Sequence, residues 1–449
     1  MQGAAGTLVM AATPEASVAA EPLLLEPEVR QAEGTLASEP VLAVPALEAT
    51  RTGNSDLQAA AAAGHAAEVE LLLQRGASPT GASSATGDFP LLTAASRGHE
   101  SVAEVLLRGR ADPAQVRVGS GSFPLLAASA GGHGAVVELL LLSRADPEQS
   151  AGPTGATALG AAAAAGHCGV ARALLRHGAD AKQENGHDGT FPLLLAAAAG
   201  HGQLVELFLA RGAEPQRVNV RGGAFSLLAA AEGGHLEVAE TLLRHAADPD
   251  QVQPATGSFA LLEAASRGHA GLVQALLHWQ ADPEAVNEET GRFPLAQAAA
   301  HGHVVASEVL LRQGACPRRV NRLDGSFPLL LAAGQGHLDV AQALLHHRAS
   351  QEQTQGGTGL TPVQAALAAG HAHLAEQLLR RSRPRPVLLS HVAAGPAGGA
   401  CKPGLEVRRG SSQSTADSPN SSHAGSPVRS PVSRLLSSCW EPVPAAEFA

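Results

Sequence analysis

The chain has 449 residues and a formal net charge of −10; it contains 45% hydrophobic residues but no Tyr, two Trp and nine Phe. So few aromatic residues argue against several large globular cores and favour short, closely packed helices built from Ala, Leu and Val. The mild negative charge disfavours a nucleic-acid-binding protein, and four scattered cysteines, Cys168, Cys316, Cys401 and Cys439, disfavour a disulfide framework.

The first 50 residues carry seven acidic residues and one Arg among many Ala and Pro. No basic stretch precedes their short apolar run, so we expect no secretory signal. No run in the chain approaches the ~18 apolar residues of a membrane span. We therefore expect residues 1–50 to be a disordered acidic tail on a soluble protein of the cytoplasm or the nucleus.

An internal repeat begins after this tail and fixes the fold class. Gly-His pairs recur every 34 residues without an insertion or deletion, ending at His65, His99, His133, His167, His201, His235, His269, His303, His337 and His371. A second marker lies at a constant distance before each pair: it is Phe89, Phe123, Phe191, Phe225, Phe259, Phe293 or Phe327 in seven units, and Ser55, Thr157 or Thr361 in the others. Ten units of this kind span residues 51–382.

One unit, residues 89–113, shows the elements that we expect in each repeat. Pro90 suits the first position of a helix, LLTAASR follows with good helix formers, and Gly98 suits a left-handed helix end. Apolar spacing after His99 predicts a second amphipathic helix, which ends at ADP. The remaining residues before the next Phe, ending in Gly-x, predict a turn or a short hairpin.

The unit resembles the ankyrin repeat, whose usual pattern is G-x-T-P-L-H-x-A-A-x-x-G-H followed by L-L and G-A-D; GLTPVQAALAAGH (359–371) comes closest. Tetratricopeptide repeats share the period, but their Trp and Tyr markers and short connectors do not fit this chain. Phe takes the position of the Thr in seven units, four of which read FPLL in place of T-P-L-H, and this exchanges a polar contact at the helix start for aromatic packing. The resemblance implies an all-α solenoid of ten helix-turn-helix units, with loop or hairpin connectors and an atypical repeat at each end.

Residues 383–449 change sharply to Pro, Ser, Gly and Arg, so we expect a disordered C-terminal tail. Ser418, Ser426 and Ser430 each precede Pro and are candidate phosphorylation sites.

The twenty histidines do not indicate a metal or catalytic centre. The Gly-His series lies one repeat apart, at ~8–10 Å between packed helices, whereas zinc ligands lie ~2–2.3 Å from one ion. We therefore interpret these histidines as structural, joining each inter-helix turn to a neighbouring backbone. HGH (301–303) and HAH (371–373) are weak metal motifs, and no catalytic motif or phosphate-binding loop appears. We expect no enzyme activity and no cofactor.

The connectors vary most between repeats and carry the candidate protein-binding residues. Arg217 and Arg221 lie in residues 215–223, and Arg318, Arg319 and Arg322 lie in residues 317–325. Between these two connectors, residues 283–291 present acidic side chains: Glu284, Glu288 and Glu289. The alternative is that adjacent loops neutralise one another. His301 on the first-helix surface and Trp279 at the end of a second helix are further candidates.

These features predict a monomeric, non-enzymatic scaffold or adaptor that binds one or more proteins along the concave face that the resemblance implies. Two alternatives remain. VSRLLSSCWEPVP (432–444) has the Leu-Leu and Cys of a box that recruits a ubiquitin ligase, and the acidic N-terminal tail with RRSRPRP would suit a nuclear transcriptional co-regulator. We expect no small-molecule substrate and no membrane partner.

Overall fold

The computed structural model describes residues 44–83, 86–152 and 154–382. Within these residues there are twenty helices and no extended strand. They are α1 (Val44–Ala63), α2 (Ala66–Gln74), α3 (Pro90–Arg97), α4 (Glu100–Arg108), α5 (Pro124–Ala130), α6 (Gly134–Leu142), α7 (Ala158–Ala165), α8 (Cys168–Arg176), α9 (Pro192–Ala199), α10 (Gly202–Ala210), α11 (Ser226–Gly233), α12 (Leu236–Arg244), α13 (Ala260–Arg267), α14 (Ala270–His278), α15 (Pro294–Ala300), α16 (Val304–Arg312), α17 (Pro328–Gln335), α18 (Leu338–His346), α19 (Pro362–Ala368) and α20 (Ala372–Ser382).

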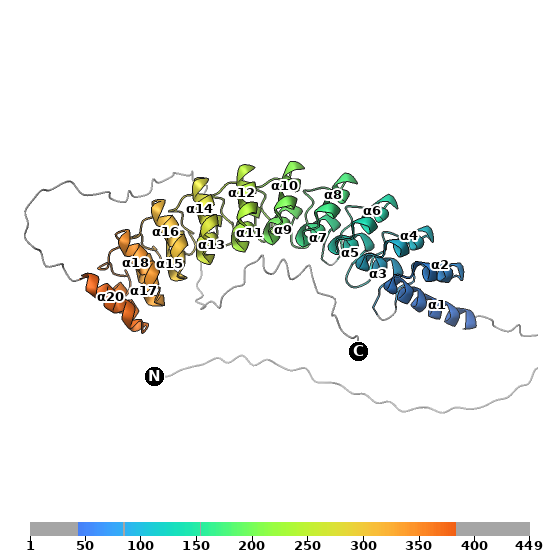
Figure 1. Cartoon of the computed structure of the whole chain (residues 1–449), viewed down its shortest axis with the longest axis horizontal. Helices are drawn as coiled ribbons and strands as arrows, with labels where there is room; N and C mark the ends of the chain where they lie inside the picture. Colours follow the sequence, from blue (N-terminus) through green and yellow to red (C-terminus); the bar gives the residue numbers. More distant parts are fainter. Residues whose placement is uncertain (1–43, 84–85, 153, 383–449) are drawn as a thin grey trace, which may run out of the picture. The chain divides into compact units, whose positions relative to one another are not determined.

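The helices form two layers, as Figure 1 shows. Odd-numbered helices from α3 to α19 each pack against the next odd-numbered helix, and even-numbered helices from α2 to α18 do the same. From α3 onwards, each odd-numbered helix also packs against the even-numbered helix that follows it. The main contacts between helices therefore run within a repeat and to its neighbours, which confirms the predicted all-α solenoid of about ten units.

The first helix of most repeats begins at a phenylalanine whose backbone is extended. Phe89 precedes α3, with Pro90 as the first helical residue, and makes no capping bond through its side chain. The ring is instead fully buried, as are those of Phe123, Phe225 and Phe327. At Thr361 the polar cap returns, since its hydroxyl accepts from the Gln364 backbone N–H in a capping box. The exchange of polar capping for aromatic packing is therefore confirmed.

The Gly-His pairs interlock consecutive repeats. Imidazole Nε2 donates to a backbone carbonyl 37 residues earlier, in the last turn of the first helix of the preceding repeat. The distance is 3.1 Å for His99 to Ala62 and 3.0 Å for His303 to Ser266. The same bond is made by His133, His167, His201, His235 and His337. These histidines are structural, as predicted. We call the series the Gly-His ladder.

Each connector closes in a tight turn of constant geometry. In residues 215–225, Val218 forms an isolated β-bridge with Phe225, and the Asn219 N–H donates to the Ala224 carbonyl over 2.7 Å. Matching bridges join Ser150 to Thr157 and Val252 to Phe259. The predicted turn or short hairpin is present.

At the N-terminal side, α1 begins at Val44, so it extends into the segment expected to be a disordered tail. Ala, Leu and Glu at residues 46–49 favour a helix and join the alanine-rich first repeat. Residues 1–43 and 383–449, which include most of the two predicted tails, lie outside the described residues. No helix in the described part of the chain has the length and apolar character needed to cross a membrane.

Candidate protein-binding surface

Two polar ladders hold the connectors together, and sequence reasoning missed both. In the first, a glutamine amide donates to the backbone carbonyl 35 residues earlier, as Gln149 does to Ala114 over 3.0 Å. Five glutamines occupy this position, which we call the glutamine position: Gln115, Gln149, Gln183, Gln251 and Gln353. In the second ladder, buried amide side chains donate to the carbonyl 31 residues earlier, as Asn287 does to Thr256 over 2.8 Å.

Arg217 and Arg319 occupy the glutamine position in their own repeats. Each guanidinium donates to the carbonyl 35 residues earlier, that of Lys182 or Glu284, over 2.5 Å. Each also pairs with an acidic side chain, Arg217 with Glu184 and Arg319 with Glu284. The Arg217 and Arg319 guanidinium carbons lie over the Phe191 and Phe293 rings, 5.2 and 5.5 Å from the centroids. These two arginines therefore take part in the stacking of repeats.

Glu284 and Arg318 also reach into the following repeat. A Glu284 carboxylate oxygen accepts from the Cys316 backbone N–H over 2.6 Å, and Arg318 Nε donates to the Arg348 carbonyl over 2.9 Å. The charged side chains of neighbouring connectors thus partly neutralise one another, as one reading of the sequence anticipated.

The remaining candidates lie at the connector tips, and among them Arg221 also bonds between repeats, since its Nη2 donates to the Gly186 carbonyl over 3.3 Å. Arg221, Glu288, Glu289 and Arg322 are all exposed. Two apolar side chains accompany them, Val220 with 76% and Leu323 with 65% of its surface exposed. We call these six residues the tip patch. Exposed Val and Leu beside charged groups are typical of a protein-binding surface. The apolar members were missed because the repeat pattern alone does not separate tip positions from packed ones.

The other two candidates lie apart from the tip patch. His301 follows α15 and stacks on His303 at 6.0 Å, while its Nδ1 lies 3.0 Å from the Gln297 carbonyl. Trp279 follows α14 and is 39% exposed beside a shallow hollow between the second helices α12 and α14.

Electrostatic shifts in this region arise from burial. Burial, followed by the charge of Arg267, lowers the pKa of His269 below its usual 6.5. Burial also raises the pKa of Asp250 above 3.8, against the opposing effect of a hydrogen bond from the Asp282 N–H. Both residues belong to contacts between repeats, so neither shift marks a reactive group.

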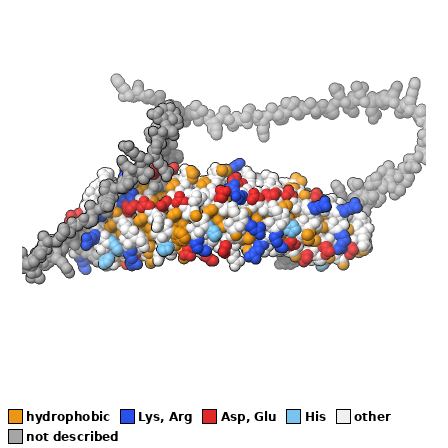
Figure 2. Space-filling view, turned by 90° about the horizontal axis from the view of Figure 1, so that it is seen from above, with side chains coloured by type: hydrophobic (Ala, Val, Ile, Leu, Met, Phe, Trp, Pro, Cys, Tyr) orange, Lys and Arg blue, Asp and Glu red, His pale blue; other side chains and the backbone are white. Residues whose placement is uncertain are grey.

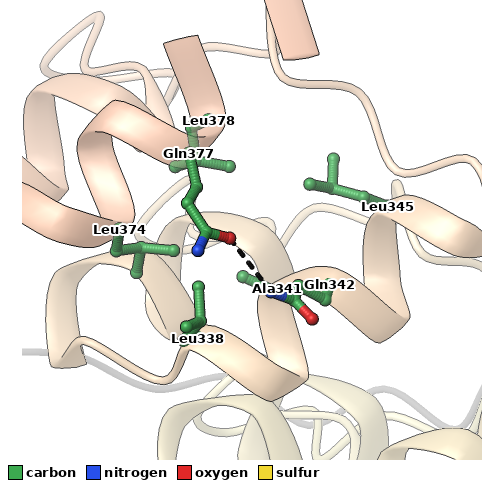
Figure 3. Close-up of a pocket in the computed structure, with 7 residues that line it drawn as sticks. All are labelled: Leu338, Ala341, Gln342, Leu345, Leu374, Gln377 and Leu378. Carbon is green, nitrogen blue, oxygen red and sulfur yellow. Dashed lines mark hydrogen bonds between the residues drawn. The ribbon is translucent and has the colours of Figure 1, made fainter. Parts of the chain in front are cut away.

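The described residues contain no grouping of three or more His, Cys, Asp or Glu arranged to hold a metal ion. A small crevice lies between α18 and α20, where leucines of both helices face one another and Gln342 donates to Gln377 over 3.0 Å (Figure 3). Its volume of about 10 Å³ leaves room for about one water molecule, so it is a packing defect and not a ligand site.

Charge is spread along the solenoid. Seen from above, acidic side chains follow one another in a row, with Lys, Arg and His side chains distributed on either side and hydrophobic ones between them (Figure 2). This face suits a protein partner with mixed charge better than a uniformly charged polymer.

Comparison with known proteins identifies the repeat. A model of three ankyrin repeats matches residues 125–219, 226–321 and 295–386, and a model of a single ankyrin repeat matches residues 86–117. No curated protein matches the chain. Among 488 matching solved chains, the crystal structure of the human ASB11 ankyrin repeat domain is similar at 27% identity, with a TM-score of 0.47, over 51% of this chain and 99% of that chain.

Proposed function

The chain belongs to the ankyrin repeat family, whose repeats mediate protein–protein interactions, and we propose that it is a non-enzymatic scaffold that binds its partner through the tip patch. The observation that carries this proposal is the contrast between the two kinds of connector residue. Arg217, Arg319 and Glu284 are held between repeats by ion pairs, whereas Arg322 and the two tip glutamates are exposed. Arg221 is also exposed and makes one 3.3 Å bond to the Gly186 carbonyl.

The chemistry of the tip patch defines the partner that it fits. Arg221 and Arg322 suit acidic side chains, and Glu288 and Glu289, which lie on a connector between theirs, suit a basic one. Val220 and Leu323 supply exposed apolar contact area beside these charges. A partner with acidic groups on both sides of a basic group matches this order of charges.

The test is affinity purification of the full-length protein from cells, comparing wild type with Arg221→Glu/Arg322→Glu. A matched control, Arg75→Glu/Arg211→Glu, makes the same change in net charge at exposed ends of the second helices α2 and α10. We expect the amount of co-purified partner to fall roughly tenfold or more for the tip variant, since one disrupted anchor costs more than about 1 kcal/mol of binding free energy. For the control, the amount should be unchanged. Unchanged partners in the tip variant, or equal loss in both variants, would rule out the tip patch.

A further inference from the structure

The hollow on the second-helix layer lies beside a Glu–Arg pair of positions that forms an ion pair on the second helices of three other repeats. In three repeats, a glutamate on the second helix pairs with an arginine four residues later: Glu104 with Arg108, Glu308 with Arg312 and Glu376 with Arg380, at 2.5–2.7 Å. Glu240 and Arg244 occupy the same positions on α12.

Here the pair is not made, because Arg244 Nη2 donates to the Thr241 hydroxyl over 2.9 Å. Thr241 in turn donates to the Glu237 carbonyl over 2.8 Å, which fixes its hydroxyl in place. Among the described residues, no cation pairs with the exposed Glu240 carboxylate.

The hollow extends from this carboxylate along the full length of α14. Leu236 lines one end and Trp279 the other, and each is 39% exposed. Gly271 on α14 leaves space in the hollow, because a β-carbon there would fill it and lie in contact with Leu236 at 3.5 Å. Gln274, His278 and Gln313 complete the polar part of the lining. The site therefore offers apolar contacts at both ends, with the Glu240 carboxylate and these polar side chains between them.

A ligand that fits needs a basic group next to aliphatic or aromatic side chains. The C-terminal segment beyond α20 contains this combination twice, as Arg385 with Leu388 and Leu389, and as Arg434 with Leu435, Leu436 and Trp440.

Tether length selects between these two segments. The hollow lies three repeats from α20, or about 30 Å at the spacing of packed helices. Leu389 follows the end of α20 so closely that even an extended chain reaches at most about 25 Å. The segment that begins at Val432 follows a linker of about 50 residues, whose root-mean-square length of about 40 Å is well matched to the span. Such a match gives the highest effective concentration.

We propose that residues 432–440 occupy the hollow between α12 and α14, with Arg434 paired to Glu240 and the leucines and Trp440 against Leu236 and Trp279. The segment is then an intramolecular ligand of the second-helix layer, on a surface separate from the tip patch. A partner that binds either the hollow or the segment has to displace this contact, which makes the tail a built-in competitor.

The full-length protein offers a direct readout because Trp279 and Trp440 are its only two tryptophans. With Trp440→Phe, all tryptophan emission comes from Trp279, and its accessibility is measured by acrylamide quenching. Adding Leu435→Asp/Leu436→Asp should raise the quenching constant roughly twofold, since the indole face returns to water. The matched control, Leu388→Asp/Leu389→Asp, changes the nearer segment and should leave the constant unchanged.

A charge exchange tests the ion pair. Glu240→Arg and Arg434→Glu should each raise quenching, and the double variant should restore it, because the opposite charges then face each other again. No increase with Leu435→Asp/Leu436→Asp overturns the proposal, as does an equal increase in the control. Protection of Trp279 that grows with protein concentration would also overturn it, because it assigns the hollow to a second copy of the chain.

Discussion

At the scale of single residues, the glycine before each ladder histidine leaves no room for a side chain, because the imidazole of the following repeat lies against it. Gly200 has a φ of 79°, and a β-carbon on it would lie 2.5 Å from His235 Nδ1 of the following repeat. The same close approach recurs from Gly64 to Gly336, each beneath the imidazole of the next repeat. Gly370 has a φ of 83° but no described atom within 4 Å of that position, because no further described repeat follows it.

This difference separates backbone strain from steric conflict. Gly200→Ala and Gly370→Ala both place alanine in the left-handed region, at a cost of about 1–2 kcal/mol. Only Gly200→Ala also drives a methyl group into an imidazole, which adds about 1–3 kcal/mol. Urea denaturation of the full-length protein should therefore show the larger loss for Gly200→Ala.

The control is His235→Ala, in which the obstructing ring is gone. In that background, the cost of Gly200→Ala should fall to that of Gly370→Ala. An undiminished cost would mean that the ring is not what excludes alanine.

The Gly-His pairs, the helix starts at Pro and the burial of Phe were predictable because each leaves a local mark that recurs in phase. Arg110 and Arg144 were not predictable in this way: they adopt the left-handed conformation, with φ of 64° and 67°, at the position where Gly212 and Gly314 stand in other repeats. Propensity disfavours arginine there. Arg348, which no ADP follows, has the same conformation, so it belongs to the helix end, where the Ala111 N–H donates to the Leu106 carbonyl over 2.9 Å.

At the scale of elements, the connectors are held by side chains that substitute for one another. Gln149 and Arg319 differ in charge, yet both donate to the carbonyl 35 residues earlier. The requirement is a long side chain with an N–H donor, not a charge. Charge in a connector therefore marks both arginines that stack between repeats and arginines that are exposed.

Substitutions of Arg319 test whether this position needs a hydrogen-bond donor or a positive charge. Arg319→Gln keeps the hydrogen bond that glutamine makes in five other repeats and loses the ion pair with Glu284 and the contact with Phe293. It should therefore lower the free energy of unfolding by less than about 1 kcal/mol. Arg319→Ala removes the hydrogen bond and the contact with Phe293, at a cost of about 1–3 kcal/mol. Urea denaturation midpoints measure both, and equal destabilisation by Gln and Ala would refute this role.

The partners of these side chains could not be predicted from the sequence. The turn itself was recognisable from Gly and Pro, but the offsets of 35 and 31 residues depend on how one repeat stacks on the next. The tip patch was therefore found only in part, as charged residues mixed with stacked ones.

At the scale of the whole solenoid, stability depends on neighbours, because helices contact mainly their own repeat and the adjacent ones. The last repeat has a packed neighbour on one side among the described residues, and Leu367 there is 55% exposed. The corresponding residues of the preceding repeats, such as Ala333 and Ala299, are completely buried.

Amide hydrogen exchange of the full-length protein should show this difference. We expect backbone amides of α19 to exchange faster than those of α9 and α11, since a helix stacked on both sides opens only with its neighbours. Mass spectrometry of peptides from these helices checks the order. Equal protection in α19 and α11 would mean that the stack unfolds as a single unit.

The constant offsets of the ladders also bear on how such a chain changes over time. Every bond of the three ladders joins residues that are a fixed number of positions apart, so duplication or loss of one complete 34-residue block leaves each ladder donor facing an acceptor. Loss of a single residue in a connector shifts three sets of bonds at once. Unequal recombination in whole blocks is therefore the length change that this architecture tolerates, and repeat copy number can vary where connector length cannot.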